Sequence, residues 1–355
     1  MKRLLPLLLC SIALTGFPAA AQNPAPEIPY DSAANPLTMP DDIYLGEVGG
    51  VATNSQGEVF VYSRTGHPTV SLGGSRNFAH GGSRLFKFDR NGRYAGEIGK
   101  DSYGFMFANQ VRIDPQNNIW VVDQMSSMVM EFDPTGRNVV FLLGRKAEAI
   151  PIPARPAGGG GEGGGGGAAA TGAGAPQDVF NRPTDVAWDS GGNIFVADGL
   201  GNARIAKFDR DGKFIKSWGQ KGTGPGQFAN VRSIAVDAQG NVYAADGGNH
   251  RIQVFDNNGT YRTEFRNVGN NPQALCLTTG ANPVMYVSNS NPPNDIDTAG
   301  EIYKMRLDGT IIGKFGRAGK QLKEFGTVNA IDCRNENNLW IGEVGNLRVQ
   351  RITLR

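Results

Sequence analysis

The sequence predicts an all-β fold: a six-bladed β-propeller of four-stranded antiparallel blades, with the ring closed by an N-terminal strand. Two observations support this prediction. Short apolar segments that open with an aromatic residue recur six times along the 355 residues. Glycine is abundant, at 50 residues, and is often placed in evenly spaced turns. A repeat of roughly 40–50 residues with this pattern is typical of a propeller blade.

The recurring segments are predicted second strands. Before most of them lies a polar turn such as DPQNN or DSGGN, preceded by another short alternating strand. After each comes a third strand such as HRIQVFD, a turn such as DRDG, and in five repeats a fourth strand. Alternating apolar residues let each sheet bury both faces against its neighbours. The six segments are FVYS (60–63), WVVD (120–123), FVAD (195–198), YAAD (243–246), YVSN (286–289) and WIGE (340–343).

The sixth repeat lacks a fourth strand, which leaves a sheet edge to be covered. The stretch DDIYLGEV (41–48) has strand character and no partner in the first repeat. We expect it to pair with residues 347–354, because this pairing removes two open edges. The propeller is therefore assigned to residues 41–355, after a linker over residues 22–40.

Residues 1–21 have the layout of a cleaved secretory signal. Two basic residues precede an apolar run, and small residues end near Ala21. A lipid anchor on Cys10 is the alternative, although Leu9 is larger than such processing usually accepts. We expect export, to a periplasm or outside the cell. Without this segment 33 basic and 33 acidic residues remain. Because this balance leaves no net positive charge to attract phosphates, we expect no nucleic acid partner. No later segment is apolar enough to span a membrane.

The exported chain would keep two cysteines, Cys276 and Cys333. Export permits a disulfide between them. Both lie in apolar strand patterns, however, so we favour two small buried side chains without a bond.

The long connections gather on one predicted face of the ring. Turns between first and second strands, and between third and fourth, are short. The long segments, 64–82, 145–181 and 289–300, are second-to-third or blade-to-blade connections. Insertions on one face mark the expected binding face. The Gly-rich tract at about 150–176 is expected to be a flexible insertion there.

Four segments carry a resemblance to a known family. They are residues 45–68, 183–219, 288–309 and 337–354, while GNHRIQVF (248–255) resembles the NHL repeat. Together they resemble the catalytic core of peptidyl-α-hydroxyglycine α-amidating lyase over essentially the whole exported chain. This resemblance implies a central zinc bound by three first-strand histidines, assisted by a tyrosine and two arginines. Zinc would polarise the substrate hydroxyl while a base takes its proton.

Most of these residues are replaced here. Arg64 matches the first arginine, and His67 also matches. The three histidine positions fall on Asn109, Arg232 and Asn329. The tyrosine and second-arginine positions fall on Leu200 and Gly247. Arginine offers no lone pair to a metal, and asparagine is not a usual zinc ligand, so we predict neither a zinc site nor another cofactor.

The equivalent first-strand positions form a predicted polar ring around the channel. One interpretation is a hydrated lining. The functional alternative is an anion or amide site in which Arg64 and Arg232 grip a carboxylate. The ring consists of Gly49, Asn109, Thr184, Arg232, Gln273 and Asn329.

Three functions follow, and the first is favoured. It is a ligand-binding propeller, a pseudoenzyme on a lyase scaffold, that takes a peptide, a glycan or a small anionic ligand on its loop-rich face. The second is an active amidating-lyase-like carbon–oxygen lyase. The third is a calcium-dependent lactonase-type hydrolase, with oxygen ligands from Asn109, Asn329 and Asp185.

His67, which lies just after Arg64, is also a candidate ligand-binding residue, but the histidines are weak candidates as metal ligands. His67 and His80 share a long loop, where two ligands make a weak metal site, and His250 fits ordinary repeat sequence. Acidic residues recur at second-strand ends, where we expect hydrogen bonds to turns rather than acid–base catalysis. These acidic residues are Asp123, Asp198, Asp246 and Glu343.

Overall fold

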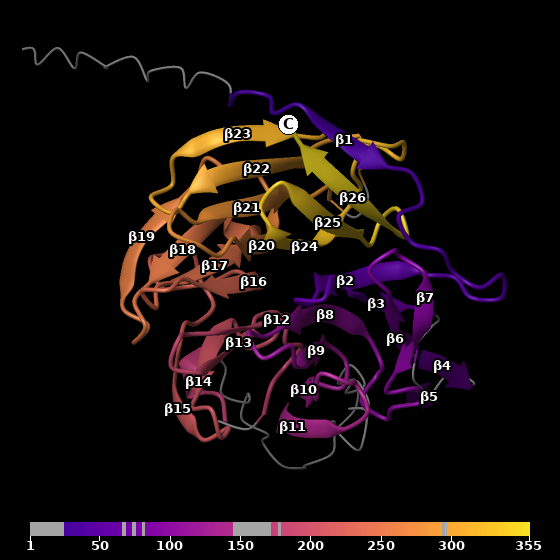
Figure 1. Ribbon diagram of the computed structural model, residues 1–355. Coiled ribbons are helices and arrows are strands. Elements are labelled where there is room, and N and C mark those ends of the chain that lie inside the picture. The colour runs from indigo at the N-terminus through magenta and orange to yellow at the C-terminus, as the bar shows by residue number, and fades with distance from the viewer. Residues whose placement is uncertain are drawn as a thin grey trace, which may run out of the picture.

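The computed structural model describes residues 25–65, 69–72, 76–79, 82–144, 172–176, 179–292, 295 and 297–355. Within these residues, six four-stranded antiparallel sheets surround a central axis, with the first strand of each sheet innermost (Figure 1). The predicted six-bladed propeller is confirmed. From the axis outward, blade 1 is β2 (Glu47–Thr53), β3 (Val59–Arg64), β6 (Ser83–Phe88), β7 (Tyr94–Ile98), and blade 2 is β8 (Ala108–Ile113), β9 (Ile119–Asp123), β10 (Met128–Phe132), β11 (Val139–Gly144). Blade 3 is β12 (Asp185–Trp188), β13 (Ile194–Asp198), β14 (Arg204–Phe208), β15 (Phe214–Trp218), and blade 4 is β16 (Val231–Val236), β17 (Val242–Asp246), β18 (Arg251–Phe255), β19 (Tyr261–Phe265). Blade 5 is β20 (Pro272–Leu277), β21 (Val284–Asn289), β22 (Glu301–Arg306), β23 (Ile311–Phe315), and blade 6 is β24 (Val328–Asn335), β25 (Asn338–Glu343), β26 (Arg348–Leu354), β1 (Tyr30–Ala33).

Neighbouring blades pack face to face through the alternating side chains of each strand. In β9, Ile119 and Val121 join the apolar cluster between blades 1 and 2. The intervening Trp120 and Val122 join the cluster between blades 2 and 3. Because successive strand residues point to opposite faces, one short apolar strand supplies two interfaces. In the described part of the chain, such clusters fill each of the six junctions between blades.

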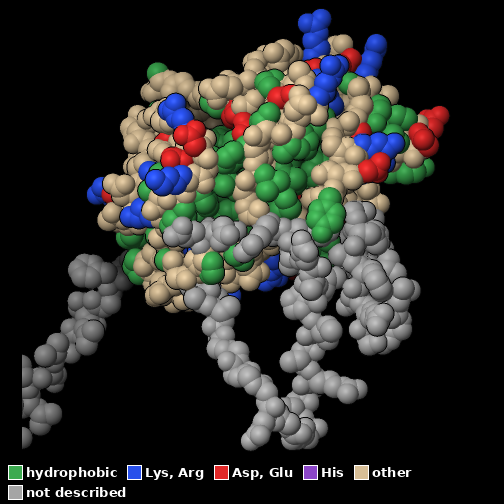
Figure 2. Space-filling model, turned by 90° about the horizontal axis from the view of Figure 1, so that it is seen from below, with side chains coloured by type: hydrophobic (Ala, Val, Ile, Leu, Met, Phe, Trp, Pro, Cys, Tyr) green, Lys and Arg blue, Asp and Glu red, His purple; other side chains and the backbone are tan. Residues whose placement is uncertain are grey.

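The outermost strands leave one set of side chains in solvent. In β11, Val140 and Leu142 are exposed, while Phe141 and Leu143 pack toward blade 3. Figure 2 looks at the rim from below the view of Figure 1 and shows hydrophobic side chains gathered on this side. The exposure follows from the edge position, because only one face of the outer strand has a neighbour.

Short turns connect third to fourth strands on one face of the ring. Asp209 accepts hydrogen bonds from the backbone N–H groups of Asp211 and Lys213, at 3.0 and 2.8 Å. Gly212 then adopts a φ of +80°, which glycine tolerates best. An aspartate therefore organises the turn from its first position.

The long connections lie on the other face, as predicted. They join β3 to β6, β11 to β12 and β21 to β22. The first contains a small hairpin, β4 (Thr69–Leu72) and β5 (Arg76–Ala79), and the second a short 3-10 helix, η1 (Gly172–Gly174). Most of the predicted insertion at 150–176 lies outside the described residues, as does the predicted signal at 1–21. Among the described helices, none is long and apolar enough to cross a membrane.

The ring is closed by an N-terminal strand, but not by the predicted one. β1 pairs with β26, from Tyr30 opposite Leu354 to Ala33 opposite Arg351. It lies within residues 22–40, which the sequence assigned to a linker. The predicted segment 41–48 instead leads into β2. Its apolar residues Ile43 and Leu45 pack against the cluster between blades 6 and 1, which explains its strand-like pattern.

The two cysteines are bonded, contrary to the favoured prediction. Cys276 in β20 and Cys333 in β24 form a disulfide between the first strands of blades 5 and 6. Both side chains are buried, as expected. Their strands lie side by side only in the folded ring, so a separation of 57 residues in the sequence gave no sign of the contact.

Replacing both cysteines by serine (C276S/C333S) should lower the free energy of unfolding by about 2–4 kcal/mol, because the bond closes a long loop in the unfolded chain. Urea unfolding with and without a thiol reductant measures this. The reductant should shift the wild-type midpoint and leave the double variant unchanged. If the reductant leaves the urea midpoint of the wild type unchanged, and free thiols are detected in the untreated protein, the Cys276–Cys333 disulfide is contradicted.

Candidate functional site at the channel mouth

Each first strand presents its channel position at an irregularity of the backbone. The pairing of β2, β8, β16, β20 and β24 with their second strands shifts register at this point. In blade 3, Thr184 lies immediately before β12. A bulge frees a side chain from the alternation of the sheet, so these residues do not pack between blades. The skipped residues are Gly49, Asn109, Arg232, Gln273 (with Ala274) and Asn329.

The amide side chains of this ring bond across the channel. Asn329 donates to the carbonyl oxygens of Gly49 at 2.6 Å and Asn109 at 2.8 Å. Gln273 donates to the Asn329 side-chain oxygen at 2.7 Å. The Asn109 amide donates to the carbonyl of Thr184 at 2.5 Å. The ring is thus a hydrogen-bonded layer in which the side-chain amides are bonded mostly to backbone carbonyls of neighbouring blades and once to one another.

Arg232 differs from the rest of the ring. Its Nε atom is buried and has no hydrogen-bond partner among the described residues. Its Cγ lies 3.2 Å from where a Cβ on Gly247 would stand, so the side chain passes beneath the loop after β17. Burial first, and repulsion from Arg182 second, lower the pKa of Arg232. A buried guanidinium therefore has a second cation beside it, with no carboxylate paired to it in the described structure.

Arg182 was not indicated by the sequence. It is exposed, with a φ of +58°, and precedes the first strand of blade 3. Its carbonyl accepts a hydrogen bond from the Leu200 N–H at 3.4 Å, which places it beside the second-to-third loop of that blade. Only the packing of blade 3 on blade 4 brings it near Arg232. The exposed Arg182 and the largely buried Arg232 are thus two neighbouring positive charges, which would attract an anion.

Arg64 is occupied elsewhere. Its Nε donates to the Ala108 carbonyl at 2.8 Å, and its Nη1 to Glu47 at 3.0 Å. The guanidinium carbon lies 3.8 Å from the Phe107 ring centroid. Arg64 thus lies where blades 1 and 2 meet, whereas Arg232 belongs to blade 4. The structure gives these two arginines no shared contact, and the two-arginine grip on a carboxylate stays a prediction.

A second polar layer fills the channel further along the first strands. Arg112 donates from Nε and Nη2 to both carboxylate oxygens of Asp185, at 2.9 and 2.6 Å. Ser233 donates to the same carboxylate, and Arg112 also reaches the Leu275 carbonyl at 3.1 Å. Burial alone would lower the pKa of Arg112, but Asp185 outweighs it and raises the pKa. This buried pair links blades 2, 3, 4 and 5.

The acidic residues at second-strand ends anchor loops, as expected. Asp246 accepts hydrogen bonds from the backbone N–H groups of Ala229 and Asn230, just before β16. Its other oxygen pairs with the buried Arg251 at 3.1 Å. Asp123 accepts from the N–H groups of Met106 and Phe107. Similar contacts surround Asp198 and Glu343.

The histidines contribute no metal site to the described structure. His67 and His80 lie outside the described residues. His250 follows the short 3-10 helix η2 (Gly247–Asn249), and its Nδ1 contacts the Asn270 carbonyl. His250 is therefore a loop residue of the repeat.

Comparison with known proteins bears on this geometry. A family profile, DUF5128, described as a 6-bladed beta-propeller, matches residues 180–293. Peptidylglycine alpha-amidating monooxygenase of Rattus norvegicus is 29% identical over 231 residues, which cover 60% of this chain and 21% of that protein. Peptidyl-alpha-hydroxyglycine alpha-amidating lyase 1 of Drosophila melanogaster is 26% identical over 271 residues, 71% of this chain and 45% of that protein.

The chain is a six-bladed propeller homologous to the amidating lyases. It spans about a fifth of the rat protein and less than half of the fly lyase. Among solved structures, a catalytically inactive virginiamycin B lyase from Staphylococcus aureus with quinupristin has a TM-score of 0.55 at 12% identity, covering 93% of this chain and 100% of that one. At this identity the similarity shows a shared fold.

The residues present do not fit the zinc of the amidating lyases. The three histidine positions hold Asn109, Arg232 and Asn329. The side-chain oxygens of both asparagines already accept hydrogen bonds, from Gln124 and Gln273, and a guanidinium repels a divalent cation. No group of three His, Cys, Asp or Glu residues suited to a metal occurs in the described part of the chain.

Two further positions of the lyase set are altered, and the calcium alternative loses a ligand. Leu200 stands at the tyrosine position. Gly247 stands at the second-arginine position, and Arg232 packs against it. Asp185, the carboxylate expected to bind calcium, is committed to Arg112 and Ser233.

The substitution Asp185→Asn should destabilise the fold by about 3–5 kcal/mol, because it leaves Arg112 buried without its counter-charge. Urea unfolding at neutral pH measures the loss. Glu336→Gln is the matched control, since it removes an ion pair with Lys304 in which Glu336 is 45% exposed, and should change stability by less than about 1 kcal/mol. Equal effects of the two substitutions would contradict the buried-pair interpretation.

The purified chain should contain well below one zinc or calcium ion, because its channel offers amides and guanidinium instead of imidazoles. The protein would be expressed with both metals supplied, desalted, and analysed by mass spectrometry. One zinc per chain, lost on replacing Asn109 or Asn329 by alanine, would contradict this prediction.

Proposed function

We propose that this protein is an exported, zinc-independent propeller that binds a carboxylate-bearing ligand at the channel mouth of its loop-rich face. The observation that carries the proposal is the pair Arg182 and Arg232. One guanidinium is largely buried, the other lies at the rim, and neither forms an ion pair with a described residue. Holding two cations together costs free energy, which a bound anion would recover.

Arginine suits this task because its planar fork matches a carboxylate in two parallel hydrogen bonds. The unpartnered Nε of Arg232 supplies one donor that is already removed from water. Below it, the bonded amides of Asn109, Gln273 and Asn329 cross the channel. A ligand would therefore be held at the mouth, with its remainder on the loop-rich face. A peptide ending in a free carboxylate has this chemistry, as does a small organic acid.

Export is the second part of the proposal. It rests on the signal-like pattern of residues 1–21 and is supported by the disulfide between Cys276 and Cys333. Disulfides persist mainly in oxidising compartments outside the cytosol.

Arg232→Met should weaken binding of N-acetyl-phenylalanyl-glycine at least ~10-fold, because charge-assisted hydrogen bonds contribute about 1.5–3 kcal/mol. Methionine keeps the alkyl packing against Gly247. Arg182→Met should weaken binding in the same direction. Isothermal titration calorimetry measures each affinity, with the C-terminal amide of the peptide as the uncharged comparison.

Arg306→Met serves as the matched control, since Arg306 is exposed at the end of β22 on the short-turn face. It should bind the peptide like the wild type. Wild-type protein that binds the acid and the amide equally, or an Arg232→Met variant of unchanged affinity and melting temperature, would refute the arginine site.

A further inference from the structure

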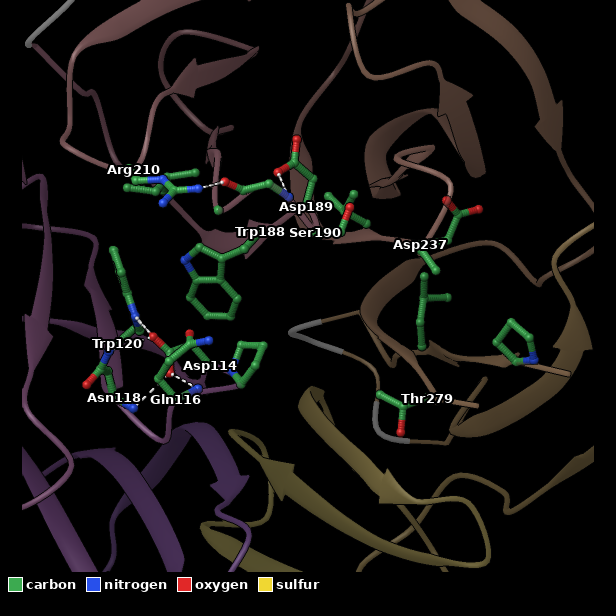
Figure 3. Close-up of a pocket in the computed structure, with 18 of the residues that line it drawn as sticks. Asp114, Gln116, Asn118, Trp120, Trp188, Asp189, Ser190, Arg210, Asp237 and Thr279 are labelled. Atoms are coloured by element: carbon green, nitrogen blue, oxygen red, sulfur yellow. Dashed lines mark hydrogen bonds between the residues drawn. The ribbon is translucent and has the colours of Figure 1, made fainter. Parts of the chain in front are cut away.

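A pocket opens on the face opposite the arginine pair. It lies among the first-to-second turns of blades 2 to 5 and has a volume of about 680 Å³. Figure 3 shows Trp188 between Asp189 on one side and Asp114 and Gln116 on the other, with Asp237 and Thr279 across the opening. None of these residues belongs to the candidate site at the channel mouth.

One wall of this pocket is aromatic. The rings of Trp120 and Trp188 have centroids 5.3 Å apart, at an interplanar angle of 57°. Phe141 lies behind Trp120, with its centroid 5.7 Å away. Glu131 stands directly opposite Trp120 in the pairing of β9 with β10, and opposite Phe141 in the pairing of β10 with β11. These three side chains therefore share the face of blade 2 that packs toward Trp188 in blade 3.

The lining is also acidic. Asp114, Asp189 and Asp237 each accept four hydrogen bonds from their turns and neighbouring side chains. A carboxylate offers about four lone-pair positions, so these three contribute negative charge but little bonding capacity. For Asp189, burial alone would raise the pKa, but hydrogen bonds from Asn193 and Asn257 outweigh it and lower the pKa.

Glu131 is the carboxyl group of the described lining whose oxygens can still accept further hydrogen bonds. Its side chain interacts with Asn118 and forms no ion pair with a described residue. The cation among the described lining residues is Arg210, whose guanidinium donates to the Gly191 carbonyl at 2.8 Å. Arg112 stands opposite Trp120 in the pairing of β8 with β9, but it is paired with Asp185. Negative charge beside aromatic rings thus remains uncompensated.

We infer that this pocket binds an organic cation, with an ammonium or quaternary ammonium group held against Trp188, whose ring packs on the buried Trp120, and with Glu131 as its counter-ion. The negative face of an indole attracts a cation, and the attraction strengthens where water is excluded. A nearby carboxylate adds charge complementarity that a neutral ligand cannot use. Arg210 at the rim opposes binding.

The binding should depend on pH. Burial first, and the charge of Asp114 second, raise the pKa of Glu131 to about 7. Asp189, Asp237, Arg210 and Arg112 complete the charged groups around the pocket. A bound cation favours the ionised carboxylate, so binding releases a proton near neutral pH. Affinity should therefore rise by up to about 10-fold from about pH 6 to about pH 8.

Calorimetric titration of the full chain with choline tests this inference, with 3,3-dimethylbutan-1-ol as the neutral compound of the same shape. Choline should bind at least ~10-fold more tightly than the alcohol, and Glu131→Gln should lose most of that preference. Trp188→Phe keeps an aromatic ring but should weaken binding several-fold. Arg210→Met should tighten it. Repeating the titration in buffers of different ionisation enthalpy detects the released proton, because the observed binding enthalpy then changes with the buffer.

Arg232→Met is the control on the other face, and it should bind choline like the wild type. Weaker peptide binding by Arg232→Met and a lost preference for choline in Glu131→Gln are separate results, so each proposal can fail alone. Equal binding of choline and the alcohol, tighter binding of glucose than of choline, or no choline binding up to about 10 mM would overturn the cation site. A Glu131→Gln variant with wild-type choline affinity would overturn it as well.

Discussion

In four of the six blades, a carboxylate at the end of the second strand fixes the chain that leads into the first strand of that blade. Asp246 holds the backbone N–H groups of Ala229 and Asn230, and three residues after Ala229 the chain reaches the bulge at Arg232. Asp123 does the same for Met106 and Phe107, ahead of Asn109. Burying a carboxylate is costly unless it is bonded this fully. The channel residues therefore owe their placement to side chains that never face the channel.

Arginines at the start of the third strand complete this arrangement, two of them buried and Arg348 partly exposed. Arg204, Arg251 and Arg348 each bond to the acidic residue of their blade and to backbone carbonyls of the incoming loop. One ion pair thus joins two strands and an irregular segment whose carbonyls would otherwise lack partners. The repeat can vary its loops because this pair, rather than loop sequence, holds each loop to the blade.

Local patterns in the sequence were sufficient to predict the blades, the turns and the channel positions. Alternation of apolar residues and the Asp-to-Gly turns act within a few residues, so they can be recognised without the fold. The closing strand could not be identified in this way. YDSA is short and mostly polar, whereas the more apolar segment 41–48 is needed at a blade junction. The Cys276–Cys333 bond and the approach of Arg182 to Arg232 depend on neighbouring blades, which sequence spacing does not encode.

The two polar layers show how a shared scaffold can change its chemistry. In the homologous lyases a metal ion would supply positive charge at the channel mouth. In this chain Arg232 stands at one of those positions. Asn109 and Asn329 stand at the other two, and the Asn329 side chain donates to the backbone carbonyl of Asn109. We therefore expect positive charge to be retained at this position without a Lewis acid. A guanidinium can recognise an anion, but it cannot activate a hydroxyl group as zinc does.

The pairing of β1 with β26 sets an order of assembly. Tyr30 pairs with Leu354, so the earliest strand of the ring must wait for the last one to be synthesised. Until then β1 has no partner strand, and an unpaired strand edge is the kind of edge that joins other chains. Contacts between such distant segments also slow folding. The ring can therefore close only after the last strand has been made. A polypeptide released or cleaved before that strand cannot complete the ring.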